Sequence, residues 1–168
     1  LLIAGTGNKS GKTTLACMII ERFRETGISA IKITPHFHET TPGLLLLSEE
    51  PGYSVYLETE AGTDKDTSRM LRAGASKVFF AKVRDHDLVA AFRAIMKHIP
   101  EGMAVVCESP ALRYYIEPGA FFIMNSDSAH NTKDISRLQV FPHVMLHLDD
   151  LARIDSVPVR FENGHWIS

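Results

Sequence analysis

The sequence predicts an α/β domain in which a mostly parallel, twisted sheet is covered by helices on both faces. Short apolar runs such as 105–107 and 121–124 alternate along the chain with segments whose apolar residues recur at helical spacing. Runs that are apolar throughout are typical of strands buried between helices in a parallel sheet. The 168 residues fit one such domain, and we treat 1–168 as a single unit.

The N-terminal segments predict a strand, a loop, a helix and a second strand. The run LLIA at 1–4 is too short for a helix and long enough for a buried strand. Leu15, Met18, Ile19 and Phe23 then share one face of a predicted helix, which should end near Gly27 in a left-handed conformation. The apolar run that follows predicts the second strand over 28–34.

The remaining elements follow from the same patterns. Helices are predicted over 66–73, 86–99 and 111–116, and strands over 76–83, 103–109 and 120–125. The prolines and glycines between 35 and 64 predict an irregular stretch, within which 53–58 is a short strand. The run at 144–150 and the Asn163-Gly164 turn signal predict a C-terminal edge strand or hairpin.

Composition excludes several classes of function. The chain is 45% hydrophobic and 23% charged, with a net charge of −2, so it lacks the basic surplus of nucleic-acid or membrane-surface binders. No apolar stretch approaches the roughly 20 residues of a membrane span. The only cysteines, Cys17 and Cys107, fall in apolar segments, a usage typical of reduced, buried thiols. We therefore expect a cytoplasmic protein.

The run GTGNKSGKTTL joins the first strand to the first helix. A helix start presents unpaired N–H groups and the positive end of a dipole, which together attract anions. Glycines at 5, 7 and 11 let the backbone approach phosphate closely, Lys12 can reach the β and γ phosphates, and the Thr13 hydroxyl can hold Mg²⁺. The expected ligand is therefore a nucleotide, GTP or ATP.

The spacing of the glycines differs by one residue from the usual phosphate-binding pattern G-x-x-x-x-G-K. Thr6 stands five residues before Gly11, so the loop reads G-x-x-x-x-x-G-K-T from Gly5, a variant that resembles the loop of dethiobiotin synthetase. The alternative is a glycine-rich turn with a surface lysine. We expect Thr14 at the helix surface, and the predicted ligand-binding segment comprises Gly7, Asn8, Lys9, Ser10, Gly11, Lys12, Thr13 and Thr14.

Ligands of such sheets lie at the carboxyl ends of the strands. The polar residues that follow predicted strands are His36, His38, Asp64, Asp66, Glu108, Asn125 and Asp127. Glu108 ends a buried strand, where a carboxylate is costly unless paired or metal-bound, so we expect it to hold Mg²⁺ with Thr13. The alternative is a solvated strand-end carboxylate. Asp66 is the second expected Mg²⁺ ligand and catalytic acid, or the N-cap of the next helix, or both.

Two further features leave alternatives open. His36 and His38 would lie on one face if the strand continued, which suits a structural or substrate contact better than zinc, because no Cys-x-x-Cys motif accompanies them. Guanine specificity is not readable, because the N-K-x-D motif is absent and residues 131–134 read as a surface helix start. Asn125 is a candidate for contact with the base.

Four segments together resemble the P-loop protein of molybdopterin-guanine dinucleotide biosynthesis, the MobB family. They are GTGNKSGKTTL, IKITPHFH, KDTSRMLRAGA and VVCES, and their order spans about residues 1–125. The resemblance implies a P-loop NTPase fold. It also implies that Lys12 and Thr13 bind phosphate and Mg²⁺, that Asp66 and Arg69 border the nucleotide or partner site, and that Glu108 supplies the strand-end acid.

The resemblance also implies a function. Members of that family bind GTP, hydrolyse it slowly, are commonly dimers, and assist the guanylyltransferase that completes the molybdenum cofactor. We therefore expect an accessory nucleotide-binding protein whose catalytic residues are Lys12, Glu108 and Asp66. The alternatives are an ATP-dependent ligase or kinase resembling dethiobiotin synthetase, which needs further basic residues such as Lys32 and Lys65, and a non-catalytic nucleotide-dependent adaptor.

Overall fold

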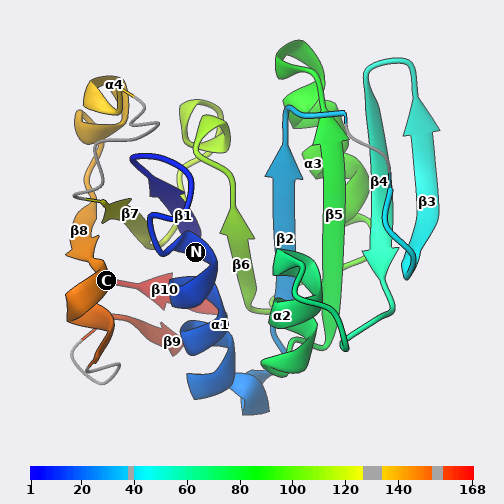
Figure 1. The fold of residues 1–168 in the computed structure, drawn as a ribbon. Helices are drawn as coiled ribbons and strands as arrows, with labels where there is room; N and C mark the ends of the chain where they lie inside the picture. The colour runs from blue at the N-terminus through cyan, green and yellow to red at the C-terminus, as the bar shows by residue number, and fades with distance from the viewer. Residues whose placement is uncertain (38–39, 127–133, 153–156) are drawn as a thin grey trace.

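Eight strands form one mixed sheet in the order β3-β4-β5-β2-β6-β1-β7-β8 (Figure 1). The computed structural model describes residues 1–37, 40–126, 134–152 and 157–168. The strands of this sheet are β1 (Leu2–Gly5), β2 (Ser29–Thr34), β3 (Leu44–Glu50), β4 (Tyr53–Glu58), β5 (Lys77–Val83), β6 (Val105–Glu108), β7 (Phe121–Asn125) and β8 (Val144–His147). All neighbouring pairs are parallel except β3–β4 and β4–β5. The fold class is therefore α/β with a mostly parallel sheet, as predicted.

Helices cover both faces of this sheet. They are α1 (Lys12–Arg22), α2 (Asp66–Arg72), α3 (Leu88–Met96) and α4 (Ser136–Gln139). One core packs α1 and α2 against the sheet through residues that include Leu15, Ile19 and Met70. A second core on the opposite face packs α3 through Leu88 and Ile95. The sheet therefore lies between two layers of helices, and the carboxyl ends of its parallel strands lie together along one edge of the sheet.

The first helix is shorter than its sequence pattern predicts. It ends at Arg22, and a 3₁₀ turn at Arg24–Thr26 carries the chain to Gly27, which has φ 72° and ψ 44°. Gly27 therefore adopts the predicted left-handed conformation, which glycine reaches without the steric cost that a Cβ imposes. The helix over 86–99 is likewise shorter, because α3 spans Leu88–Met96 after a 3₁₀ turn.

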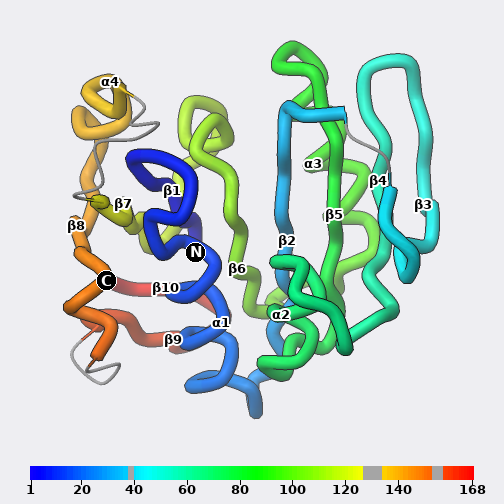
Figure 2. The backbone as a smooth tube through the Cα atoms, viewed as in Figure 1, coloured from blue at the N-terminus to red at the C-terminus, as the bar shows by residue number. Residues whose placement is uncertain are grey.

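The prediction of an irregular stretch from 35 to 64 is wrong at β3. Leu44–Glu50 and Tyr53–Glu58 form an antiparallel hairpin in which β3 is the edge strand of the sheet and β4 pairs in turn with β5 (Figure 2). The run LLLLSEE shows no alternation of apolar and polar residues, and its pairing shifts register between Leu46 and Ser48. Pairing with β4, rather than a local pattern, therefore makes this segment a strand.

The C-terminal residues form both an edge strand and a hairpin. β8 pairs with β7 at the sheet edge, while β9 (Arg160–Glu162) and β10 (His165–Ile167) form a separate antiparallel pair. Asn163 and Gly164 join them with φ of 52° and 79°, as expected of a hairpin turn that needs two left-handed residues. Trp166 fixes the hairpin to the α1 face, where its Nε1 donates to the Val105 carbonyl at 2.9 Å.

Within the described ranges, no helix has both the length and the apolar character needed to cross a bilayer.

Replacing Trp166 with alanine tests the hairpin contact. The indole is buried, and its ring centroid lies 5.2 Å from that of Phe23 and 5.0 Å from that of Phe161. Trp166→Ala should lower the free energy of unfolding by about 3–5 kcal/mol, because it removes a large buried ring and leaves a cavity. Ile167→Ala, at an exposed neighbouring position, should lower it by less than about 1 kcal/mol in the same urea titration.

Candidate functional site

The order of the strands brings β1 and β2 to either side of β6. In the register of the sheet, Ile3 of β1 and Lys32 of β2 are both paired with Glu108 of β6. The chain leaves β1 through the glycine-rich loop, residues 5–11, and enters α1. The loop, the end of β6 and the side chain of Lys32 therefore converge at the carboxyl edge of the sheet, where ligands of open α/β sheets bind.

The glycine-rich loop requires glycine at both ends. A Cβ at Gly5 would lie 2.4 Å from the Ser10 Oγ and 2.9 Å from the Lys12 Cγ, so the loop folds back tightly over the end of β1. Gly11 has φ 94°, and a Cβ there would also lie 2.9 Å from the Met124 Cε. Gly11 is the N-cap of α1 and provides no side-chain cap, so the first turn of the helix keeps N–H groups available to an anion.

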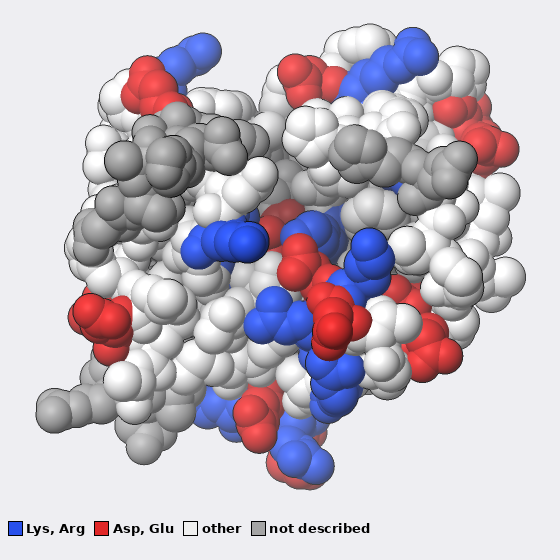
Figure 3. Space-filling model, in the orientation of Figure 1, with Lys and Arg blue, Asp and Glu red and all other residues white. Residues whose placement is uncertain are grey.

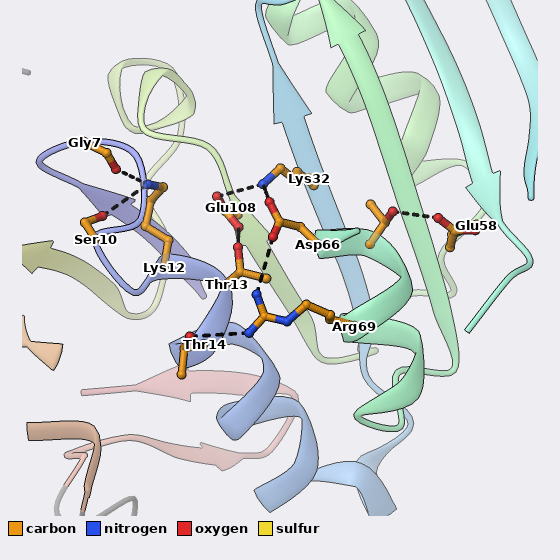
Figure 4. Close-up of polar contacts among 11 residues, drawn as sticks. Gly7, Ser10, Lys12, Thr13, Thr14, Lys32, Glu58, Asp66, Arg69 and Glu108 are labelled. Carbon is orange, nitrogen blue, oxygen red and sulfur yellow. Dashed lines mark hydrogen bonds and ion pairs between the residues drawn. The ribbon is translucent and has the colours of Figure 1, made fainter. Parts of the chain in front are cut away.

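The Lys12 side chain turns back over the loop. Its Nζ donates to the Gly7 carbonyl at 2.6 Å and to the Ser10 Oγ at 3.2 Å (Figure 4). The ammonium group is therefore held against the concave side of the loop, beside the start of α1. An anion in the loop would offer stronger acceptors than a neutral carbonyl and a hydroxyl.

Glu108 is buried and engaged from two sides. It is 5% exposed, and its Oε2 accepts a hydrogen bond of 2.8 Å from the Thr13 Oγ1. Its Oε1 accepts from the Lys32 Nζ at 3.1 Å. A buried carboxylate is costly without such partners, so the predicted alternative of a solvated strand-end acid is wrong for Glu108. The same contacts fix the start of α1 against β2 and β6.

Asp66 lies on the other side of Lys32. Lys32 donates to the Asp66 Oδ2, and the Arg69 guanidinium lies 3.6 Å from the Asp66 Oδ1 (Figure 4). Burial is the largest single effect on Asp66 and opposes its ionisation, but the charges of Lys32 and Arg69 and the hydrogen bonds from Lys32 and Thr13 together outweigh it, so the pKa of Asp66 is held below the ordinary value. For Lys32, burial by itself would lower the pKa. The negative charges of Glu108 and Asp66 and their hydrogen bonds outweigh burial, so the pKa of Lys32 lies above its ordinary value.

The N-cap alternative for Asp66 is wrong. Asp66 is the first residue of α2, and its N-cap position belongs to Lys65, which makes no side-chain cap. The carboxylate points toward Lys32 instead, because an ion pair with a mostly buried ammonium outweighs a hydrogen bond at the helix end.

A cavity of about 560 Å³ opens between the glycine-rich loop, the start of α1 and the start of α2. We call it the loop cavity. Figure 3 shows basic and acidic side chains gathered near the middle of the face that carries these helices. The loop cavity contains most of the predicted site, and its lining residues are Asn8, Lys9, Ser10, Gly11, Lys12, Thr13, Thr14, Lys32, Asp66, Arg69, Glu108 and Leu148.

The structure separates other predicted residues from the loop cavity. Asn125 ends β7 beside β8 and is not among the described residues that line it. His36 lines a different cavity, and Asp64 is exposed. His38 and Asp127 lie outside the described residues. Thr14 was expected at the helix surface, yet it lines the loop cavity and accepts a hydrogen bond from Arg69 at 3.5 Å.

The cysteines take no part in the loop cavity. Both are free thiols, Cys17 half-buried on α1 and Cys107 buried on β6. Burial raises the pKa of Cys107 to about 12 and also raises that of Cys17. Both thiols therefore remain protonated near neutral pH and are poor nucleophiles.

The sequence did not predict the contacts that two residues, Lys32 and Leu148, make in the site. The sequence predicts Lys32 only as a basic residue for a substrate, whereas in the structure Lys32 forms ion pairs with both Asp66 and Glu108. A lysine inside an otherwise apolar strand was the available signal, because a buried ammonium needs carboxylate partners. Leu148 lines the loop cavity from the segment after β8, and nothing in its local sequence indicates that contact.

The oxygen atoms near α1 suit Mg²⁺. Thr13 and Glu108 offer a hydroxyl and a carboxylate oxygen 2.8 Å apart among the buried residues that line the loop cavity. Among the described residues no group of three or more His, Cys, Asp or Glu could hold a metal ion. Mg²⁺ in phosphate-binding sites typically uses one or two protein ligands and completes its shell with phosphate and water, so this donor set fits.

Asp66→Asn tests the electrostatics of the cluster. Folding lowers the pKa of Asp66, so its ionised form stabilises the fold at every pH above the ordinary pKa of about 3.9. This stabilisation is lost as the pH falls through the lower pKa of the folded state. At pH 7 the free energy of unfolding of the variant should be lower by up to about 1 kcal/mol, because an ion pair with a partly exposed member contributes no more than this to stability. The deficit should shrink toward pH 2.

Urea titrations at several pH values check this expectation. Asp64→Asn, two residues upstream at an exposed position, is the matched control and should leave stability within about 0.5 kcal/mol at every pH. A deficit in Asp66→Asn that did not depend on pH would contradict the assignment.

No family model, curated protein or solved structure matches this chain. The chemistry of the loop cavity must therefore be inferred from its own residues.

Proposed function

We propose that this chain is a P-loop protein that binds a nucleoside triphosphate with Mg²⁺ in the loop cavity and hydrolyses it slowly. The observation that supports this most directly is the position of Lys12, whose ammonium lies within the glycine-rich loop at the start of α1. A helix start, a glycine-rich loop and a lysine ammonium beside both together form a site for a multiply charged anion.

The loop cavity suits a triphosphate in size and charge. Lys9, Lys12, Lys32 and Arg69 line it, against two carboxylates that already have cationic partners. Its volume of about 560 Å³ lies within the range of small-molecule and cofactor sites. On binding, Lys12 would exchange the Gly7 carbonyl for phosphate oxygens, a charge-assisted and hence stronger interaction.

Mg²⁺, when bound, would neutralise charge on the phosphates. Thr13 and Glu108 are the residues that would hold it, and the hydrogen bond from Lys32 orients the Glu108 carboxylate. Both oxygens of Glu108 accept hydrogen bonds from protein groups, so we assign Glu108 to holding Mg²⁺ together with Thr13 and not to abstracting a proton. The chain's own residues thus contribute positioning and electrostatic stabilisation, which supports slow hydrolysis.

The role in molybdenum cofactor synthesis, with a guanylyltransferase as partner, is proposed from the order of the sequence motifs. GTP and ATP both remain candidate ligands. One observation favours the second candidate function, an ATP-dependent kinase or ligase: Lys32 and Lys65, named above as basic residues for a substrate, line a common cavity next to the loop cavity. A non-catalytic adaptor would bind the triphosphate without turnover.

Lys12→Ala should weaken binding of Mg²⁺-ATP and Mg²⁺-GTP by about 10- to 100-fold, because it removes one charged hydrogen-bonding group from the phosphates. Isothermal titration calorimetry measures the effect. Lys97→Ala removes a lysine from an exposed position after α3 and should bind as the unaltered protein does. Equal affinities in all three proteins would refute the site.

Glu108→Gln tests the acid independently of the lysine. Removing this charge should weaken the dependence of triphosphate binding on Mg²⁺ and slow phosphate release by about 10-fold or more. Product analysis with ATP and GTP then separates hydrolysis, phosphoryl transfer and binding without turnover. An unchanged Mg²⁺ dependence would exclude Glu108 from the metal site.

A further inference from the structure

A second cavity lies beside the loop cavity and is not explained by triphosphate binding. It has a volume of about 300 Å³ and opens over the sheet on the face that carries α2. We call it the side cavity. Its lining residues are Lys32, Thr34, His36, Thr41, Leu44, Lys65, Asp66, Thr67, Phe80 and Lys82.

The side cavity arises from the register of β2 and β5. Lys32 is paired with Phe80, and Thr34 is paired with Lys82, so these four side chains project from the same face of the sheet. Leu44 reaches the same region from β3, the strand whose formation the sequence pattern missed.

The charge balance of the side cavity is positive. Lys32, Lys65 and Lys82 line it against one carboxylate, that of Asp66, which is already paired with Lys32 and Arg69. Lys82 is only 7% exposed, and its Nζ lies 5.6 Å from the centre of the Tyr56 ring. With three lysines and one carboxylate among its described lining residues, the side cavity favours an anionic ligand over a cation.

The remaining lining is apolar or neutral and polar. Phe80 and Leu44 offer half-buried hydrophobic surface, and three threonines offer hydroxyl groups. Small-molecule sites commonly combine an apolar wall with a few polar groups that fix orientation. The geometry points to a small organic anion as the ligand, a molecule that joins a phosphate or carboxylate group to a ring or other apolar body.

Lys32 and Asp66 line both cavities and form the wall between them. A ligand in the side cavity would therefore lie next to the phosphates proposed for the loop cavity, which is where an acceptor of a phosphoryl group must lie. The side cavity has its own cations and apolar wall, so binding there does not require the proposed triphosphate.

Phenyl phosphate is the probe for the side cavity, and benzyl alcohol is an uncharged compound that keeps the aromatic ring and lacks the phosphate. In a titration followed by backbone amide NMR, phenyl phosphate should shift the signals of Thr34, Thr67 and Phe80, while benzyl alcohol should bind at least about 10-fold more weakly. Replacing phenyl phosphate with benzoate then distinguishes a phosphate site from a carboxylate site.

Two variants identify the cations that bind the probe. Lys82→Met should weaken phenyl phosphate binding about 10-fold or more. Lys65→Ala changes an exposed position and should weaken binding several-fold. It therefore tests the same proposal if Lys82→Met does not fold. Lys97→Met lies outside both cavities and should have no effect.

The outcomes separate the two proposals. Shifts centred on Gly11 and Thr14 that disappear in Lys12→Ala would place the probe in the loop cavity and overturn the side-cavity inference. Equal binding of benzyl alcohol, or no binding of phenyl phosphate or benzoate, would also overturn it. If phenyl phosphate binds the side cavity while Mg²⁺-ATP and Mg²⁺-GTP fail to bind, only the proposed function fails.

Discussion

The buried carboxylate of Glu108 is the constraint on which the rest of the site depends. It ends the strand between β1 and β2, where a buried carboxylate is costly unless neighbouring elements provide hydrogen-bonding partners. Thr13 at the start of α1 and Lys32 on β2 provide the two hydrogen bonds. Lys32 extends the contact to Asp66, which fixes the start of α2. One acid therefore sets the relative positions of the four elements that surround the loop cavity.

The sequence predicts this arrangement where the determinants are local. The strand, glycine-rich loop and helix at the N-terminus follow from short-range patterns, and so does the turn at Asn163 and Gly164. Glu108 was expected at a buried strand end because an apolar run precedes it. The carboxyl ends of parallel strands meet at one edge, which explains why Lys12, Thr13, Glu108 and Asp66 were expected together.

What the sequence did not predict depends on contacts between distant segments. β3 is a strand because β4 pairs with it, and its own residues lack the alternation that indicates one. The carboxylate of Asp66 was assigned to either the helix end or the site, and only the proximity of Lys32 decides between them. Lys82 occurs in an apolar run, and its place on a cavity wall depends on the pairing of β5 with β2.

The two cavities divide the carboxyl edge of the sheet into regions of different character. Polar and charged residues predominate around the loop cavity, and Leu148 is the one aliphatic side chain among its described lining residues. The side cavity combines cations with an aromatic and an aliphatic wall. Because Lys32 and Asp66 line both cavities, a change in the charge or position of either residue should alter ligand binding in both.

A crystal structure with Mg²⁺ and a non-hydrolysable triphosphate tests the central claim most directly. The account predicts phosphate density within residues 7–13, with the Lys12 Nζ on phosphate oxygens and no longer on the Gly7 carbonyl. A structure at saturating ligand in which Lys12 still contacts Gly7 and Ser10, and the loop holds no phosphate, would contradict it.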